Sequence, residues 1–119
     1  MMRLLALIFC VALHAAAFAQ SVDDELVPPT PAEAADIKTW IPLTCCWSNN
    51  CCRKVKPSAL TPLDRDHYRV EASGQSVTRT GWSRDGNTWR CTCDQDDSGK
   101  WVVHLRANTR CIFPVPQGY

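Results

Sequence analysis

Cys45-Cys46-Trp47-Ser48-Asn49-Asn50-Cys51-Cys52 places two pairs of adjacent cysteines within one short stretch of the chain. Three more cysteines follow, at Cys91, Cys93 and Cys111, and Cys10 precedes them all. A high density of cysteine in a small exported chain is typical of a domain that is stabilised by disulfides. Because such a small domain has only a thin hydrophobic core, we predict that these cysteines decide the fold.

The N-terminal residues have the features of a secretory signal. Arg3 gives a positive start, residues 4–13 form an apolar run, and Ala17-Phe18-Ala19 fits a small-residue cleavage site. The run is shorter than the roughly 20 residues that a membrane-spanning helix requires. We predict a signal peptide over residues 1–19 and a secreted or periplasmic mature chain with no stable membrane insertion. Cys10 would leave with the signal, so seven cysteines would remain.

Charge and composition describe the mature chain further. Without Arg3, the 13 Lys and Arg residues fall to twelve, which balance the 12 Asp and Glu residues. A net charge near zero argues against a nucleic-acid partner. Residues 20–44 are acidic and rich in proline, which predicts a flexible lead-in. Within it, Thr30-Pro31-Ala32-Glu33 matches a capping box, which predicts a short helix carrying Ile37 and Trp40 towards the domain.

Residues 45–115 are predicted to form one disulfide-stabilised domain that is mainly β. Short runs of alternating or β-branched residues, separated by turn residues, predict about four to five antiparallel strands. The cysteine-dense segment, residues 45–52, is expected to pack on one face of this sheet. Residues 67–71, 76–80, 101–105 and 110–113 are predicted strands, and residues 80–93 are a predicted hairpin whose first arm continues the strand 76–80.

Asp85-Gly86 is the strongest turn signal in the chain. As a two-residue hairpin turn it predicts that Trp82 faces Trp89 across the ladder. Extending the ladder, and pairing Cys93 with the strand that begins at Trp101, brings most of the apolar strand residues onto one face. The predicted face comprises Thr80, Trp82, Trp89, Cys91, Cys93, Trp101, Val103 and Leu105. The opposite face is predicted to carry Arg90, Thr92 and His104.

The pairing of the cysteines is constrained but not fixed by the sequence. Adjacent cysteines rarely bond to each other, and Cys91 and Cys93 point the same way along one strand. The simplest solution links Cys91, Cys93 and Cys111 to three of the four cysteines of the segment, which are Cys45, Cys46, Cys51 and Cys52. The fourth would be free or would join two chains in a homodimer.

Two other uses of the cysteines remain open. A zinc or copper site is one, although the spacing from Cys46 to Cys51 fits the spacing of structural zinc ligands only loosely. A thiol-redox role is the other, because Arg53, Lys54 and Lys56 follow Cys51-Cys52 and positive charge lowers the pKa of a thiol. The redox spacing C-x-x-C is absent. We expect no cofactor.

Residues 94–99 resemble the first half of a calcium-binding loop, with Asp94, Asp96 and Ser98 at alternate positions. The twelfth position is Leu105 instead of glutamate, so we interpret the segment as a polar hairpin turn. No catalytic constellation is recognisable, which disfavours an enzyme. Trp40 and Trp47 fall outside the predicted apolar face. We expect them to close the core under the cysteine-dense segment, and if exposed they are candidate binding aromatics.

Four segments, 45–52, 79–86, 101–104 and 108–114, resemble a group of small exported cysteine-rich proteins of alphaproteobacteria. The resemblance covers about Cys45 to Pro114. It implies a periplasmic or extracellular location and carries no activity. The residues themselves favour a non-catalytic module that binds an unknown envelope or extracellular partner through the cysteine-dense segment or the opposite face of the sheet. The alternative is a periplasmic protein for thiol-redox chemistry or metal handling.

Overall fold

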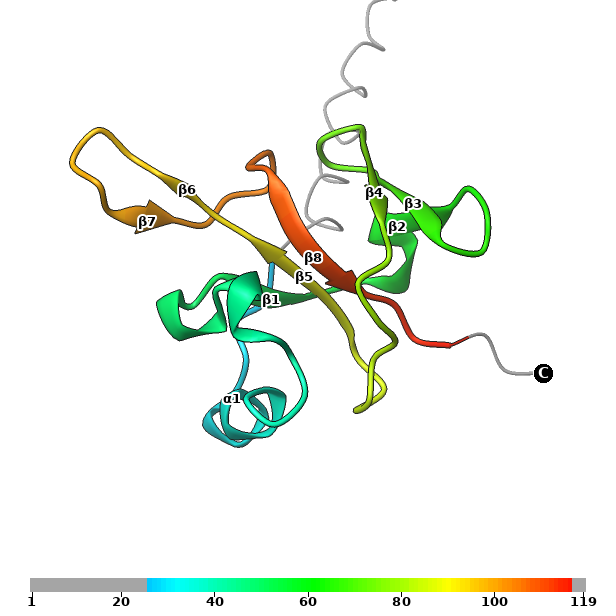
Figure 1. Ribbon diagram of the computed structural model, residues 1–119, viewed down its shortest axis with the longest axis horizontal. Coiled ribbons are helices and arrows are strands. Elements are labelled where there is room, and N and C mark those ends of the chain that lie inside the picture. Colours follow the sequence, from blue (N-terminus) through cyan, green and yellow to red (C-terminus); the bar gives the residue numbers. More distant parts are fainter. Residues whose placement is uncertain (1–25, 117–119) are drawn as a thin grey trace, which may run out of the picture.

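Strand β5 (Thr88–Thr92) lies in the centre of the domain, between β1 (Cys52–Val55) and β8 (Thr109–Phe113) (Figure 1). Both neighbours run antiparallel to it, and every residue of β5 is buried. The computed structural model describes residues 26–116. The predicted signal peptide and Cys10 therefore lie outside the described residues.

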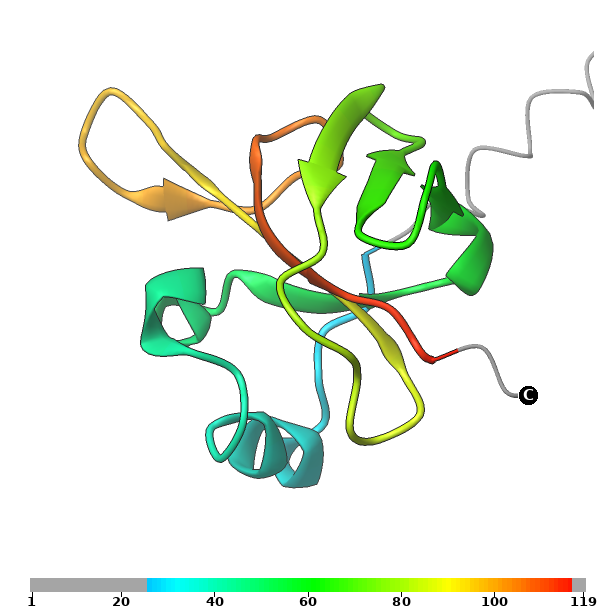
Figure 2. The same cartoon turned by 45° about the vertical axis from the view of Figure 1, so that its right-hand side comes forward.

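Two smaller sheets accompany this central sheet. Strands β2 (Leu60–Pro62), β3 (His67–Val70) and β4 (Gln75–Thr78) form an antiparallel meander, and in Figures 1 and 2 β4 runs beside β8. Strands β6 (Asp94–Gln95) and β7 (Trp101–Val102) form a hairpin that projects from the domain (Figure 1). The expected mainly-β, disulfide-rich antiparallel fold is confirmed, but its strands are divided among three sheets.

Helix α1 (Pro31–Ile37) begins where the sequence predicts. The hydroxyl of Thr30 accepts a hydrogen bond from the Glu33 N–H at 3.2 Å, and the Glu33 carboxylate accepts one from the Thr30 N–H at 2.9 Å. This reciprocal arrangement pairs two N–H groups that a helix start would otherwise leave free. Single-turn 3₁₀ helices η2 (Leu43–Cys45), η3 (Trp47–Asn49) and η4 (Pro57–Ala59) follow.

The described part of the predicted lead-in is packed on the domain. Val27 and Lys54 exchange two backbone hydrogen bonds, of 2.9 and 2.8 Å, along the free edge of β1. Ile37 and Ile41 are both buried in the core. Residues 26–44 therefore belong to the same folded unit as the strands, and the first cysteine does not mark its start.

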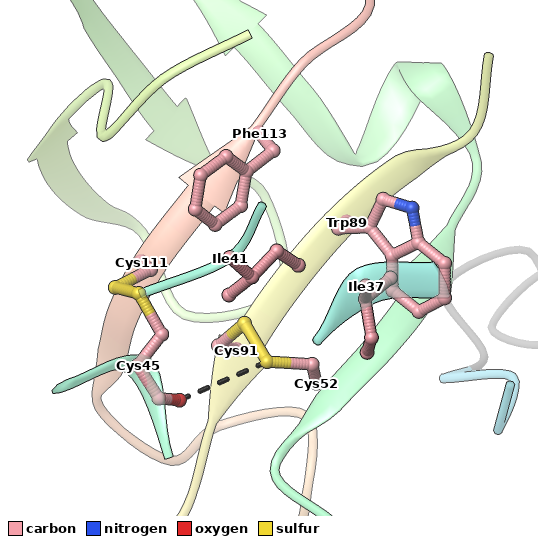
Figure 3. Packing of buried hydrophobic residues seen from close by; sticks show 8 residues of the cluster. All are labelled: Ile37, Ile41, Cys45, Cys52, Trp89, Cys91, Cys111 and Phe113. Carbon is pink, nitrogen blue, oxygen red and sulfur yellow. Dashed lines mark hydrogen bonds between the residues drawn. A yellow bond between two sulfur atoms is a disulfide. The ribbon is translucent and has the colours of Figure 1, made fainter. Parts of the chain in front are cut away.

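The main core is a layer of sulfur, aliphatic and aromatic side chains on one face of the central sheet (Figure 3). In β5, Trp89 and Cys91 alternate onto this face, and Phe113 and Cys111 lie opposite them in β8. Ile37 and Ile41 cover the layer from the α1 side. The cluster consists of Ile37, Ile41, Cys45, Cys52, Trp89, Cys91, Cys111 and Phe113.

A second cluster joins the central sheet to the meander. Ile112 points to the face of β8 opposite Cys111 and is fully buried against Leu60, Tyr68 and Val70. Tyr68 and Val70 alternate with exposed residues along β3, as the sequence predicts for a strand with one buried face. Ile112 therefore couples two sheets that exchange no ladder of their own.

The predicted hairpin of residues 80–93 is wrong. Residues 80–84 cannot pair with β5, because β1 and β8 occupy both of its edges. They run beside β8 instead, where the Thr80 N–H donates to the Ile112 carbonyl and the Ser83 N–H donates to the Pro114 carbonyl. At the turn only Gly86 has a positive φ, of 84°. A type I′ turn needs positive φ at both central residues, and Asp85 does not supply it.

The predicted apolar face is wrong as well, because it was built on the same hairpin. Only Trp89, Cys91 and Cys93 are buried, whereas its other members are half-buried or exposed. Trp101 pairs with Gln95 and not with Cys93, so the register is displaced by two residues. The opposite face also differs from expectation: Arg90 and Thr92 are buried, and only His104 is exposed.

Candidate functional site

The seven cysteines of the described range form three disulfides and leave one thiol. The bonds join Cys45 to Cys111, Cys51 to Cys93 and Cys52 to Cys91, and Cys46 is free. Each strand cysteine is thus bonded to one cysteine of the segment, the simplest pattern that the sequence predicts. The bonded cysteines are almost entirely buried. They hold the segment to the central sheet and are not available for chemistry at the surface.

Cys46 lies at the junction of η2 and η3. Its backbone has a φ of 65°, and its half-buried thiol donates to the Thr44 carbonyl across 3.8 Å. The left-handed conformation turns the chain between the two short helices. It separates Cys46 from Cys45, whose sulfur enters the core. The sulfur of Cys52 lies 3.7 Å from the Cys45 carbonyl (Figure 3), but a bonded sulfur has no proton to donate, so this is a packing contact.

The purified mature protein is expected to expose one alkylatable thiol per chain. Iodoacetamide without reductant should add one label, because only Cys46 is free among the described cysteines. Cys46→Ala should remove that label, and peptide mapping by mass spectrometry checks both. Two or more labels on the untreated protein would contradict the three bonds. If the intact protein instead has twice the mass of one chain, and reductant returns it to the mass of one chain, Cys46 forms a disulfide between two chains.

The calcium-loop candidate forms the polar hairpin between β6 and β7. The Asp96 carboxylate accepts hydrogen bonds from the Ser98 N–H at 2.9 Å, the Ser98 hydroxyl at 2.7 Å and the Lys100 N–H at 2.9 Å. These bonds, led by the Ser98 hydroxyl, lower the pKa of Asp96. Asp94 lies instead beside His104, at 4.0 Å. Across residues 26–116, no three metal-ligating side chains are grouped together.

Trp47 borders a shallow hollow of about 340 Å³ between α1 and η3. Its indole N–H donates to the Ile41 carbonyl at 2.9 Å, and the Lys38 ammonium lies 5.7 Å from the ring centroid. The ring packs against the main core. Trp47 is therefore held mainly as a cover for the disulfide layer, and its polar atom is already paired.

A second hollow, of about 320 Å³, has two tryptophans in its walls. We call it the aromatic cleft and define it by Trp40, Pro42, Gly81, Trp82, Arg84 and Phe113. It brings together the turn after α1, the segment that follows β4, and the end of β8. These three parts of the chain are distant in sequence, and the β8 disulfide at Cys111 lies two residues before Phe113.

Trp40 is fixed within this cleft by two contacts. Its indole N–H donates to the Asp36 carboxylate at 3.0 Å, one helical turn earlier. Its ring meets Phe113 edge-on, with centroids 5.4 Å apart and an interplanar angle of 87°. Aromatic rings favour this arrangement because the positive edge of one faces the negative face of the other. The indole thus has little freedom to leave the wall.

Trp82 is fixed from outside the cleft. The Arg79 guanidinium stacks on its ring, with Cζ 4.0 Å from the centroid. Asp66 holds this guanidinium through a 2.8 Å ion pair and also accepts the Arg79 backbone N–H at 2.6 Å. Cation–π attraction and the ion pair together orient the indole. Trp82 belongs to neither buried cluster, so its orientation does not depend on the core.

Gly81 forms the base of the cleft without contributing a side chain to it. Its φ is not positive, so no backbone conformation demands glycine there. A Cβ at this position would lie 3.3 Å from Cε1 of Phe113, a tight contact. The missing side chain therefore lets the Phe113 ring approach the backbone and leaves the space between the two tryptophans open.

The loop beside the cleft is anchored by Asp85. Its carboxylate accepts hydrogen bonds from the Trp89 indole and the Ser83 hydroxyl, both at 3.0 Å, and from the Asn87 N–H, also at 3.0 Å. Partial burial raises the pKa of Asp85, but these hydrogen bonds outweigh it and the pKa lies below its usual value. The ionised carboxylate thus ties the loop that contains Arg84 to the buried Trp89.

The sequence identified one wall of this cleft and missed the other. Trp40 was a candidate binding aromatic, but the hairpin register placed Trp82 in the core. A signal was present: Gly81 beside Trp82 breaks the apolar alternation of a buried strand.

Within the described range, no helix is long and apolar enough to cross a bilayer. The chain matches no protein-family model, no curated protein and no solved structure.

Proposed function

We propose that this protein is a secreted or periplasmic binding module, non-catalytic, whose aromatic cleft holds part of an envelope or extracellular partner. The observation that carries the proposal is the immobilisation of Trp40 and Trp82 in the two walls of one hollow. A side chain that is ordered before binding loses little conformational entropy when a ligand arrives. Tryptophan is also the residue most often responsible for binding energy at interfaces.

Three features support this proposal. The disulfides are typical of proteins that mature in an oxidising compartment, which agrees with the predicted signal peptide. They also form a rigid base for the cleft, because Cys111 and Phe113 lie on the same short strand. Finally, the polar groups around the cleft are mostly engaged in holding its walls, as Asp36, Asp66 and Asp85 are. This arrangement suits presentation of a surface more than acid–base chemistry.

The proposal is tested by fluorine NMR on the mature protein labelled with 5-fluorotryptophan. Its five tryptophans give five resonances, which tryptophan substitutions assign. We expect that, among prolyl peptides, oligosaccharides and lipid micelles, at least one class shifts the Trp40 and Trp82 resonances in a saturable way. Trp101 provides the internal control, since it is half-buried and is likewise stacked by an arginine, Arg110, at 5.0 Å. Saturable shifts confined to Trp101 or Trp47, or no shift at all, would contradict the proposal.

A thiol-based role is the second candidate, and the observation that favours it is the free, half-buried thiol of Cys46. In this role a second copy of the chain, joined through Cys46, would be the partner. The labelling experiment above measures this thiol directly. A Cys46→Ala variant that keeps every ligand-induced shift of Trp40 and Trp82 would separate the two roles.

A further inference from the structure

We propose that the ligand of the aromatic cleft is a proline-rich peptide in the polyproline II conformation, with an acidic residue beside its prolines. This inference rests on the proposed function, because it specifies what the same cleft binds. Three properties of the lining support it: the shape of the walls, the kind of hydrogen-bonding side chain that remains free, and the charge at the rim.

The walls suit flat or ring-shaped apolar groups. Two indoles, the Phe113 ring and Pro42 supply the apolar surface, and Gly81 leaves the floor without a side chain. Aromatic-lined grooves of this kind are a recurrent site for polyproline II segments, whose rigid backbone costs little entropy to bind. Such a helix has about three residues per turn, so every third proline ring faces the same side, and one such ring can enter between Trp40 and Trp82.

The free polar side chains of the lining are hydrogen-bond donors. The Trp82 indole N–H and the Arg84 guanidinium have no hydrogen-bond partner within residues 26–116. The two hydroxyls are engaged: Thr80 accepts from the Ile112 N–H at 3.1 Å, and Ser83 donates to Asp85. No carboxylate or amide side chain lines the cleft.

A prolyl segment matches this donor-rich lining. Proline has a carbonyl acceptor but no N–H, so a run of prolines offers acceptors alone. The indole N–H of tryptophan is a donor only and pairs with such carbonyls. An oligosaccharide, by contrast, presents many hydroxyl donors, which would find no side-chain carboxylate or amide here. The hydrogen-bonding pattern therefore favours the peptide over the sugar.

The charge at the rim specifies the acidic residue. Arg84 is exposed and forms no ion pair with any described residue, whereas the Arg79 charge is paired with Asp66. The nearby carboxylates of Asp36 and Asp85 are held by indole N–H groups. One unpaired guanidinium thus remains beside the cleft, and a guanidinium fork binds a carboxylate through two parallel hydrogen bonds. An aspartate or glutamate next to the prolines would reach it.

The test is a titration of the fluorotryptophan-labelled mature protein with capped synthetic peptides. One peptide has an aspartate between two runs of three prolines, a second has lysine in place of the aspartate, and a third replaces the prolines with glycine and serine. Chitotetraose is the sugar arm. We expect the aspartate peptide to bind most tightly and to shift the Trp40 and Trp82 resonances, with the lysine peptide several-fold weaker.

Variants make the result specific to the cleft. Trp82→Ala is expected to weaken binding of the aspartate peptide about tenfold or more, while the matched control Trp101→Ala leaves it unchanged. Arg84→Ala should abolish the difference between the aspartate and lysine peptides. Because Arg84 is exposed, this variant keeps the test informative even if Trp82→Ala folds poorly.

Each outcome decides between the two proposals. If chitotetraose shifts Trp40 and Trp82 and the prolyl peptides do not, the peptide inference falls while the binding function stands. If glycine–serine and prolyl peptides bind equally, proline recognition is overturned. If none of these ligands, nor the lipid micelles of the wider screen, moves either resonance, both the inference and the proposed function are contradicted.

Discussion

Replacing Cys45 and Cys111 together with alanine is expected to lower the free energy of unfolding by roughly 3–4 kcal/mol. The two cysteines are 66 positions apart, but the bonds Cys51–Cys93 and Cys52–Cys91 are nested between them and shorten the closed loop. The loop that is released is about 25 residues, and its chain entropy accounts for a loss of this size. For a small domain, whose total stability is commonly about 5–15 kcal/mol, such a loss is severe. Urea unfolding followed by tryptophan fluorescence measures it.

Cys46→Ala is the matched control for this experiment. It removes a cysteine adjacent to Cys45, but that thiol closes no loop among the described residues, so we expect a change below about 1 kcal/mol. Both partners of the bond must be replaced together, since Cys111 left alone can re-pair with Cys46. Equal destabilisation by the double variant and by Cys46→Ala would contradict the pairing of Cys45 with Cys111.

Replacing Arg90 with alanine is expected to destabilise the domain by about 3 kcal/mol. The side chain is only 1% exposed, and it donates to the Thr109 hydroxyl at 2.9 Å and to the Ala107 carbonyl at 3.0 Å. Burial lowers the pKa of Arg90 to about 10, so the group remains charged at neutral pH. Truncation removes two charge-assisted hydrogen bonds, each worth roughly 1.5–3 kcal/mol. Removing a charge whose burial is itself costly offsets part of this loss.

Arg53 provides the comparison, because it lies directly opposite Arg90 in the ladder. Its guanidinium is half-buried and donates to the carbonyls of Asn50 and Cys52. We expect Arg53→Ala to cost less than about 1 kcal/mol in the same urea experiment. Comparable losses for the two arginines would show that Arg90 does not hold the segment that precedes β8.

Much of this architecture follows from local chemistry in the sequence. The capping box places the start of α1 to the residue, because two side chains satisfy two helix N–H groups without help from the rest of the fold. The general disulfide pattern, in which each strand cysteine bonds one cysteine of the segment, was also accessible, since adjacent cysteines and two cysteines on one face of a strand rarely bond each other. The individual partners were left open by the sequence. These predictions depend on geometry within a few residues, and the structure confirms them.

The predictions that failed depend on which strands meet. Asp85-Gly86 was interpreted as a hairpin turn, but Asp85 uses its carboxylate to bind Ser83, Asn87 and Trp89, and so bends the chain without a ladder. The bond from Cys52 to Cys91 places β1 along one edge of β5, and β8 takes the other. No local sequence pattern predicts these strand pairings, because β1 and β8 both lie far from β5 in the sequence.

The candidate site was hidden for the same reason. Trp40 and Trp82 become neighbours only because α1 packs on the core and residues 80–83 run beside β8. The stacking of Arg79 on Trp82 also requires Asp66 from a different turn. Trp82 was predicted to be buried because of its spacing from Trp89 in the expected hairpin. Since that register was wrong, the prediction placed in the core a residue that lines the cleft.

The central claim is that the aromatic cleft, and not the cysteine segment, is the surface that this domain presents to its partner. The most direct measurement is the affinity of the aspartate–proline peptide for the wild-type protein, Trp82→Ala and Cys46→Ala, determined side by side by calorimetry. We expect Trp82→Ala to bind the peptide about tenfold more weakly or worse and Cys46→Ala to bind it like the wild type. Loss of binding in Cys46→Ala with full binding in Trp82→Ala would contradict it.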